Sequence, residues 1–129
     1  MSNQENLKYT EEHEWISVDG DIATIGVTHF AQSELGEIVY VEVDTVGEEI
    51  AKGDIFGTVE AVKTTSDLYM PVSGTIEAFN SVLDENGDDN PGIINEDAFG
   101  GGWIVKVKMS DPTELDSLLD FDGYQAIIA

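Results

Sequence analysis

The chain has 129 residues, with 27 acidic side chains against 5 lysines, no arginine and a formal net charge of −22 at pH 7. This length is typical of one domain that buries its own core, so we expect a single domain over residues 1–129. The absence of cysteine excludes disulfides and cysteine nucleophiles, and the negative charge argues against binding to nucleic acid or anionic membranes.

The N-terminal segment MSNQENLKYTEEHEW has neither the cationic and apolar parts of a secretion signal nor the arginine-rich pattern of a transit peptide. No later apolar run approaches the length of a membrane span. We therefore expect a cytoplasmic protein, or the mature form of an imported one, without membrane association. The acidic surface fits solubility, adaptation to high salt, or steering toward basic patches on partner proteins, and charge alone does not choose between them.

The first third of the chain predicts strands and one short helix. Alternating apolar residues predict strands at 15–18, 22–25 and 37–43. The Asp-Gly-Asp sequence at 19–21 is a strong signal for a tight hairpin between the first two strands. Thr28 then caps a short helix that has Phe30, Ala31 and Leu35 as its apolar positions, and Gly36 supplies the left-handed stop.

The segment 53–74, GDIFGTVEAVKTTSDLYMPVSG, contains two alternating runs that meet at Lys63. The apolar or small positions of the two runs are Ile55, Gly57, Val59 and Ala61, then Leu68, Met70 and Val72. The two strands should pair, so the connection between them should project Lys63 away from the buried face. Lys63 is the only basic residue between Lys52 and Lys106, and the hairpin therefore presents one amine at its tip.

Further strands are predicted at 74–79 and 103–109, which makes the core mostly antiparallel sheet. The polar segment between them superficially resembles a calcium loop that begins at Asp84. The sixth and twelfth positions of such a loop call for glycine and glutamate, but the sequence has Asp89 and Asn95 there. We expect a solvated loop without a metal ion.

A C-terminal helical segment is expected over about 111–128. Asp111 as the N-cap, Pro112 in the first turn and Glu114 as a capping-box acid predict the start of a helix. Its apolar face consists of Leu115, Leu118 and Leu119. The tail, with Phe121, Tyr124, Ile127 and Ile128, also has helical spacing, although it is short for an independent helix.

Catalytic motifs do not emerge from the sequence. It contains no nucleophile elbow, Walker loop or dinucleotide-binding glycine pattern. The Gly-Gly-Gly run at 100–102 precedes a predicted strand rather than a helix, so it reads as a flexible strand entry. His13-Glu14 is the only pair that resembles an acid–base site, but neighbouring residues on a strand point to opposite faces. We expect no catalytic residues.

A carrier function, in which a prosthetic group is attached covalently to a side chain, remains to be considered. A phosphopantetheine site needs Asp-Ser-Leu at the start of a helix, whereas 66–68 reads Ser-Asp-Leu beside strands. Biotin is the second choice, because biotin carriers usually place methionine on both sides of the modified lysine and Val62 and Thr64 flank Lys63 here. A hairpin lysine with an acid three residues earlier, Glu60, suits lipoyl attachment.

The chain resembles the H-protein family of the glycine cleavage system. The segments that carry the resemblance are 9–15, 22–43, 57–74, 93–108 and the final helix. Two departures are Ala61, where serine is commoner, and Met70, which replaces a smaller residue; neither contacts the amine. The resemblance implies a mostly β fold, a flattened antiparallel β-barrel or sandwich of the lipoyl/biotinyl hammerhead type with short peripheral helices and a C-terminal helix.

The resemblance further implies a non-catalytic, monomeric carrier with lipoate bound covalently to Lys63. Such a carrier shuttles the aminomethyl intermediate of glycine from a pyridoxal-phosphate glycine decarboxylase to a tetrahydrofolate-dependent aminomethyltransferase. A dihydrolipoyl dehydrogenase that uses FAD and NAD then reoxidises the arm. A lipoate-attaching enzyme would recognise the hairpin at Glu60, Val62 and Thr64.

In the family the loaded arm lies in a surface cleft. Matched position implies Glu14 and Asp67 as its acidic contacts, with His13 beside them. Alternatives remain open: a binding module that uses its acidic surface with Lys63 unmodified, or a carrier that hands lipoate to other enzymes. A hydrolase is a distant third, because no nucleophile and base are evident.

Overall fold

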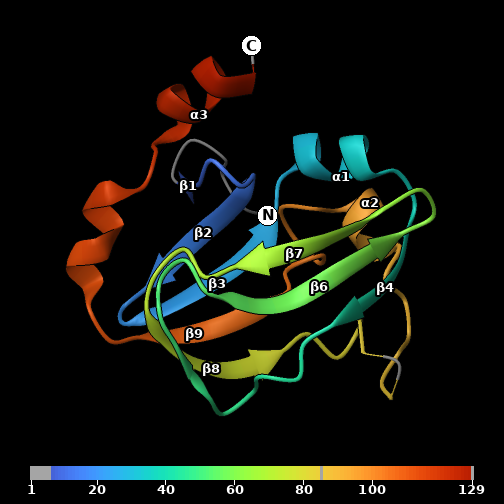
Figure 1. Cartoon of the computed structure of the whole chain (residues 1–129), viewed down its shortest axis with the longest axis horizontal. Helices are drawn as coiled ribbons and strands as arrows, with labels where there is room; N and C mark the ends of the chain where they lie inside the picture. The colour runs from blue at the N-terminus through green and yellow to red at the C-terminus, as the bar shows by residue number, and fades with distance from the viewer. Residues whose placement is uncertain (1–6, 85, 129) are drawn as a thin grey trace.

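The computed structural model describes residues 7–84 and 86–128, which form two antiparallel β-sheets with short helices around them (Figure 1). The predicted domain limits, 1 and 129, lie outside the described residues. The larger sheet has the order β1 (Lys8–Tyr9), β2 (Glu14–Asp19), β3 (Ile22–Val27), β9 (Val105–Met109), β8 (Gly74–Phe79) and β5 (Glu49–Ile50). The smaller sheet has the order β4 (Ile38–Glu42), β6 (Ile55–Ala61) and β7 (Thr65–Tyr69).

The core lies between the two sheets, which confirms the mostly β fold. Its most deeply buried aliphatic residues come from both sheets and include Ala23, Ile25, Val59, Ile76, Val105 and Val107. Each large side chain of this kind stabilises the fold by about 1.5–3 kcal/mol through burial. Both sheets are open over the described residues, so the architecture is a sandwich and not a closed barrel.

The local signals near the N-terminus are confirmed. Asp19 pairs with Ile22 across a two-residue turn, and Gly20 adopts a φ of 65° there. Helix α1 (His29–Leu35) begins where Thr28 Oγ1 accepts a hydrogen bond from the Ala31 N–H at 3.1 Å. It ends at Gly36, which has a φ of 84° and donates its N–H to the Gln32 carbonyl at 2.9 Å.

The predicted apolar face of β6 is wrong at its first residue. The pairing register with β7 shifts between Ile55 and Gly57, and a bulge of this kind reverses the alternation of side chains. Phe56 is consequently 1% exposed and Ile55 48% exposed. Beyond the bulge Val59 and Ala61 face the core as expected, and so do the predicted apolar residues of the β7 side, Leu68, Met70 and Val72.

The C-terminal helical segment is divided into two pieces, and the predicted helix face of Leu115, Leu118 and Leu119 is wrong beyond Ser117, where the first piece ends. The 3₁₀ helix η2 (Pro112–Ser117) begins at Asp111, whose side chain accepts from the Thr113 N–H at 3.1 Å. Between it and helix α3 (Phe121–Ile128), Leu119 pairs with Tyr9 through two backbone hydrogen bonds of 2.8 Å. This pairing with β1 keeps the backbone extended where the sequence predicts helix.

Glu114 binds another part of the chain instead of closing a capping box. Its carboxylate accepts from the Ser73 N–H at 2.6 Å and from Ser73 Oγ at 2.9 Å. The 3₁₀ helix is thereby fastened to the turn that precedes β8.

Removal of this contact should loosen the C-terminal segment. We expect Glu114→Ala to lower the free energy of unfolding by about 1–2 kcal/mol, because two charge-assisted hydrogen bonds at a half-buried site are lost. Urea denaturation measures the change. The exposed Asp116→Ala serves as a control on the same helix, and equal losses in both variants would contradict the role of Glu114.

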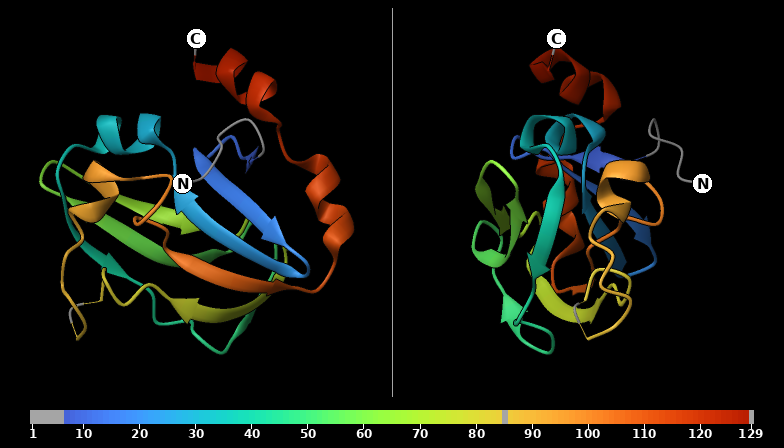
Figure 2. Two further views of the ribbon diagram at one scale, coloured as in Figure 1. Left: turned by 180° about the vertical axis from the view of Figure 1, so that it is seen from behind. Right: turned by 90° about the vertical axis from the view of Figure 1, so that its right-hand side faces the viewer.

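Different helices lie at the two ends of the sandwich. Helices α1 and α2 (Ile93–Glu96) lie at the same end as the β6–β7 turn, whereas α3 lies beyond the N-terminal strands (Figure 2). The sequence did not predict α2, and the polar residues 86–90 that precede it are exposed.

Over the part of the chain that the structure describes, no helix has the length and hydropathy to cross a membrane. No three His, Asp or Glu side chains of these residues come together as metal ligands.

Candidate functional site at the β6–β7 hairpin

The tip of the β6–β7 hairpin is held by hydrogen bonds on both of its sides. The Ala61 N–H donates to the Thr64 carbonyl at 2.8 Å and closes the turn. The Val62 N–H donates to the Glu37 carbonyl at 3.0 Å, so the tip is also tied to the residue before β4. The turn is therefore closed internally and anchored to the segment that leads into β4.

Lys63 occupies this tip and is exposed, as the sequence predicts. Its stem runs along the end of α1: a methyl group built on Gly36 would lie 3.2 Å from Lys63 Cε and 3.8 Å from Nζ. Gly36 therefore serves two purposes, since its positive φ ends the helix and its missing side chain leaves room for the lysine. The amine emerges beside α1.

The other residues predicted at the tip also face solvent. Glu60 and Thr64 are exposed, and Val62 is 71% exposed. A valine this exposed beside a lysine gives the tip a small apolar surface, which another protein can recognise. The tip thus displays one amine, one apolar side chain and one carboxylate.

Asn95 is a supporting residue that sequence reasoning missed. From α2, its Nδ2 donates to Gln32 Oε1 at 2.8 Å and to the Gly36 carbonyl at 2.9 Å, and its Oδ1 accepts from the Ile38 N–H at 2.9 Å. These bonds fix the link between α1 and β4 on which the Lys63 stem rests. An isolated asparagine gives no periodic signal, so only the folded contacts identify it.

The predicted cleft residues border two hollows. His13 and Asp67 line a cavity of about 230 Å³ between β7 and α1, together with Glu34 from the helix. Glu14 lines a separate hollow beside Tyr69. The structure therefore brings His13 and Asp67 together in one hollow and places Glu14 in the wall of the other. Glu12 borders both hollows, which are thus adjacent and acidic.

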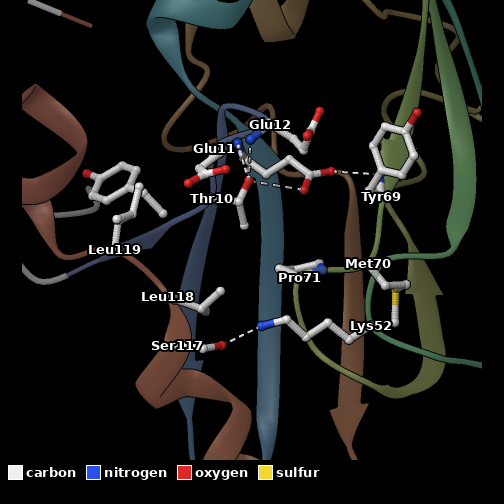
Figure 3. Close-up of a pocket in the computed structure, with 13 residues that line it drawn as sticks. Thr10, Glu11, Glu12, Lys52, Tyr69, Met70, Pro71, Ser117, Leu118 and Leu119 are labelled. Atoms are coloured by element: carbon white, nitrogen blue, oxygen red, sulfur yellow. Dashed lines mark hydrogen bonds between the residues drawn. The ribbon is translucent and has the colours of Figure 1, made fainter. Parts of the chain in front are cut away.

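Glu14 is only 2% exposed. Its carboxylate accepts from the Tyr69 N–H at 3.0 Å and, more weakly, from Thr10 Oγ1 at 3.4 Å (Figure 3). Burial raises the pKa of Glu14 to about 8, and the hydrogen bonds from Tyr69 and Thr10 offset part of this effect. The carboxyl group consequently holds its proton at neutral pH.

His13 faces a different set of partners. Its Nδ1 lies 2.9 Å from the hydroxyl oxygen of Tyr124, and its ring packs against Phe30 with centroids 4.9 Å apart. Glu14, the next residue, contacts Tyr69 instead. The adjacent side chains thus have separate surroundings; β2 begins at Glu14, and His13 precedes the strand with a φ of 66°.

An exposed amine at the anchored tip of a hairpin is typical of carrier domains, in which a group attached to the amine is displayed to other proteins. The family model of the glycine cleavage H-protein matches residues 7–129. The chain belongs to this family, and the resemblance found in the sequence is confirmed.

Relatives and a solved structure agree with this assignment. The glycine cleavage system H protein of Bacteroides fragilis is 46% identical over 128 residues, which cover 99% of this chain and 98% of that protein. The protein of the same name from Carboxydothermus hydrogenoformans is 50% identical over 123 residues, or 95% and 92% of the two chains. The crystal structure of a glycine cleavage system H protein from Mycobacterium marinum superposes with a TM-score of 0.80 at 32% identity, covering 95% of this chain and 98% of that one.

Proposed function

We propose that this member of the glycine cleavage H-protein family is a lipoyl carrier, with lipoate joined in amide linkage to Nζ of Lys63. The observation that carries the proposal is the exposed position of Lys63 at a hairpin tip held by the hydrogen bonds of Ala61 and Val62. An attaching enzyme can reach this amine without unfolding any part of the domain. Glu60, Val62 and Thr64 are the side chains it would recognise.

The surroundings of Lys63 fit the attached group. Gly36 leaves the lysine stem unobstructed, and the stem runs beside the end of α1, the helix that supplies Glu34 and Leu35 to the hollow of His13 and Asp67. When bound, lipoate supplies a dithiolane that accepts an aminomethyl group and passes it on. The chain itself contributes the tether, which keeps the carried group at roughly millimolar effective concentration near any docked partner.

The acidic hollow is suited to a cationic group. The exposed carboxylates of Glu12, Glu34 and Asp67 border it, and each attracts an ammonium at 4 Å by about 1 kcal/mol in water. Glu14 in the neighbouring hollow adds a carboxyl group that would ionise beside a cation. We assign to these residues the role of holding the carried amine between visits to partner enzymes.

The partners proposed from the family are glycine decarboxylase, aminomethyltransferase and dihydrolipoyl dehydrogenase, each visited by a monomeric carrier. The net charge of −22 would steer the carrier toward basic surfaces on these enzymes. Short-lived docking then suffices, because the tether supplies the local concentration.

This steering predicts a salt effect. We expect the KM of each partner enzyme for the lipoylated protein to rise about three- to tenfold between about 50 and 500 mM NaCl, since salt screens exposed charges. Steady-state kinetics measure the effect. Urea unfolding at both salt concentrations controls for changes in the carrier itself, and a KM that does not change with salt would contradict electrostatic docking.

The modification itself can be tested with purified protein. Wild-type protein, Lys63→Arg and Lys106→Arg are incubated with a lipoate-attaching enzyme and its substrates, and their intact masses are compared. The proposal predicts a lipoyl increment in the wild type and in Lys106→Arg, and none in Lys63→Arg. An increment that persists in Lys63→Arg would contradict it. A wild-type protein that stays unmodified would favour a binding module with a free lysine.

A further inference from the structure

Tyr124 connects the C-terminal helix to the hollow that His13 and Asp67 line. It is 2% exposed, and its hydroxyl oxygen lies 2.9 Å from His13 Nδ1 and 2.7 Å from Thr28 Oγ1. We propose that Tyr124 is a positioning residue, which fixes the ring of His13 in the wall of this hollow. The inference rests on the proposed function only where it concerns the group that the hollow receives.

The backbone around His13 shows that the position is imposed by its surroundings. His13 has a φ of 66°, a left-handed conformation that is unfavourable for a residue other than glycine. Its carbonyl accepts from the Thr28 N–H at 3.0 Å, so the two residues extend the pairing of β2 with β3. Both side chains then meet the same hydroxyl group of Tyr124. A strained residue is thus held where the ends of two strands and α3 converge.

The hydrogen bonds around Tyr124 form a chain from the cap of α1 to His13. Thr28 Oγ1 accepts from the Ala31 N–H as the cap and shares a second hydrogen bond with the hydroxyl of Tyr124. The Tyr124 oxygen shares another with His13 Nδ1. A hydroxyl group both donates and accepts, so the chain is complete in either direction. In both directions the bond at Nδ1 fixes the orientation of the His13 ring.

Ring packing keeps Tyr124 in place without its hydroxyl. Its ring stacks on that of Tyr9, with centroids 4.7 Å apart and planes 6° from parallel. The substitution Tyr124→Phe therefore removes the hydrogen bonds to His13 and Thr28 but keeps the stack. This substitution therefore tests the positioning of the His13 ring while α3 stays packed against Tyr9.

The first test uses protein without lipoate. Ring ¹⁵N and ¹H NMR spectra of the histidines are compared at about pH 8.5, above the ordinary histidine range. We expect Tyr124→Phe to shift the His13 ring ¹⁵N resonances and to weaken the contacts between His13 and Phe30, while His29 is unchanged. Tyr69→Phe is the matched loss of a hydroxyl elsewhere. Unchanged His13 signals in folded Tyr124→Phe would overturn the inference.

Wild-type protein provides a second measurement if Tyr124→Phe does not fold. The buried Tyr124 hydroxyl proton should exchange slowly with water and show a nuclear Overhauser effect to the His13 ring. Failure to observe this contact, with the other tyrosine and histidine signals assigned, would overturn the inference in the same way.

The loaded carrier tests the role in the hollow. We expect isolated, loaded Tyr124→Phe to release ammonia about two- to tenfold faster than the wild type, the factor that corresponds to one ordinary hydrogen bond. A variant with an altered His13 ring but unchanged release would overturn the positioning role. An absence of lipoate on Lys63 in the wild type would instead overturn the proposed function.

Discussion

Exchange of two neighbouring residues at the hairpin tip, Val62→Lys together with Lys63→Val, should slow lipoate attachment about a hundredfold or more, although an amine remains one residue away. The N–H of residue 62 is bound to the Glu37 carbonyl, and only the side chain at 63 passes over Gly36. An amine at 62 would leave the tip in another direction and lie several ångströms from the position of the native amine. The attaching enzyme would then meet the wrong geometry.

The rate of attachment is measured by intact mass at successive times. Lys63→Arg defines the background without an amine at the tip, and Lys106→Arg shows that another lysine is dispensable. Thermal unfolding confirms that the exchanged protein is folded. A wild-type rate in the exchanged protein would show that the tip does not direct the amine.

Glu14→Gln should remove a large pH dependence of stability. Burial raises the pKa of Glu14 from 4.5 to about 8, so between these values the folded protein binds more protons than the unfolded chain. The stabilising contribution of the protonated group is complete below about pH 4.5 and is lost as the pH rises through about 8. We expect wild-type protein to lose of the order of 5 kcal/mol relative to Glu14→Gln over this range.

The comparison requires unfolding free energies of both proteins at several pH values. Glutamine retains an oxygen that accepts from the Tyr69 N–H, and any constant cost of the amide cancels in the pH dependence. The exposed Glu11→Gln serves as a control for the change in net charge. Parallel curves for wild type and Glu14→Gln would show that Glu14 is not a protonated, buried group.

The parts of the fold that sequence predicts are those set by local chemistry. The turn at Gly20 and the cap at Thr28 depend on residues a few positions away, so the sequence contains the needed information. The β6 bulge and the extended backbone at Leu119 depend on partners in other strands. Periodicity therefore mispredicts Ile55, and helix signals after Asp111 extend too far.

The candidate site likewise contains residues that the local sequence predicts and residues that only tertiary contacts reveal. Lys63 could be predicted because the strands on both sides alternate and meet at it. Asn95 and Tyr124 act through contacts with residues far along the chain, and nothing local marks either of them as part of the site. The raised pKa of Glu14 likewise arises from tertiary burial, which its position beside His13 does not reveal.

The most direct measurement is peptide mapping by tandem mass spectrometry of the protein isolated from cells in which lipoylation is active. We predict a lipoyl increment on the peptide that contains Lys63, lost in Lys63→Arg, with none on Lys8, Lys52, Lys106 or Lys108. An unmodified Lys63, or an increment on any other lysine, would contradict the account.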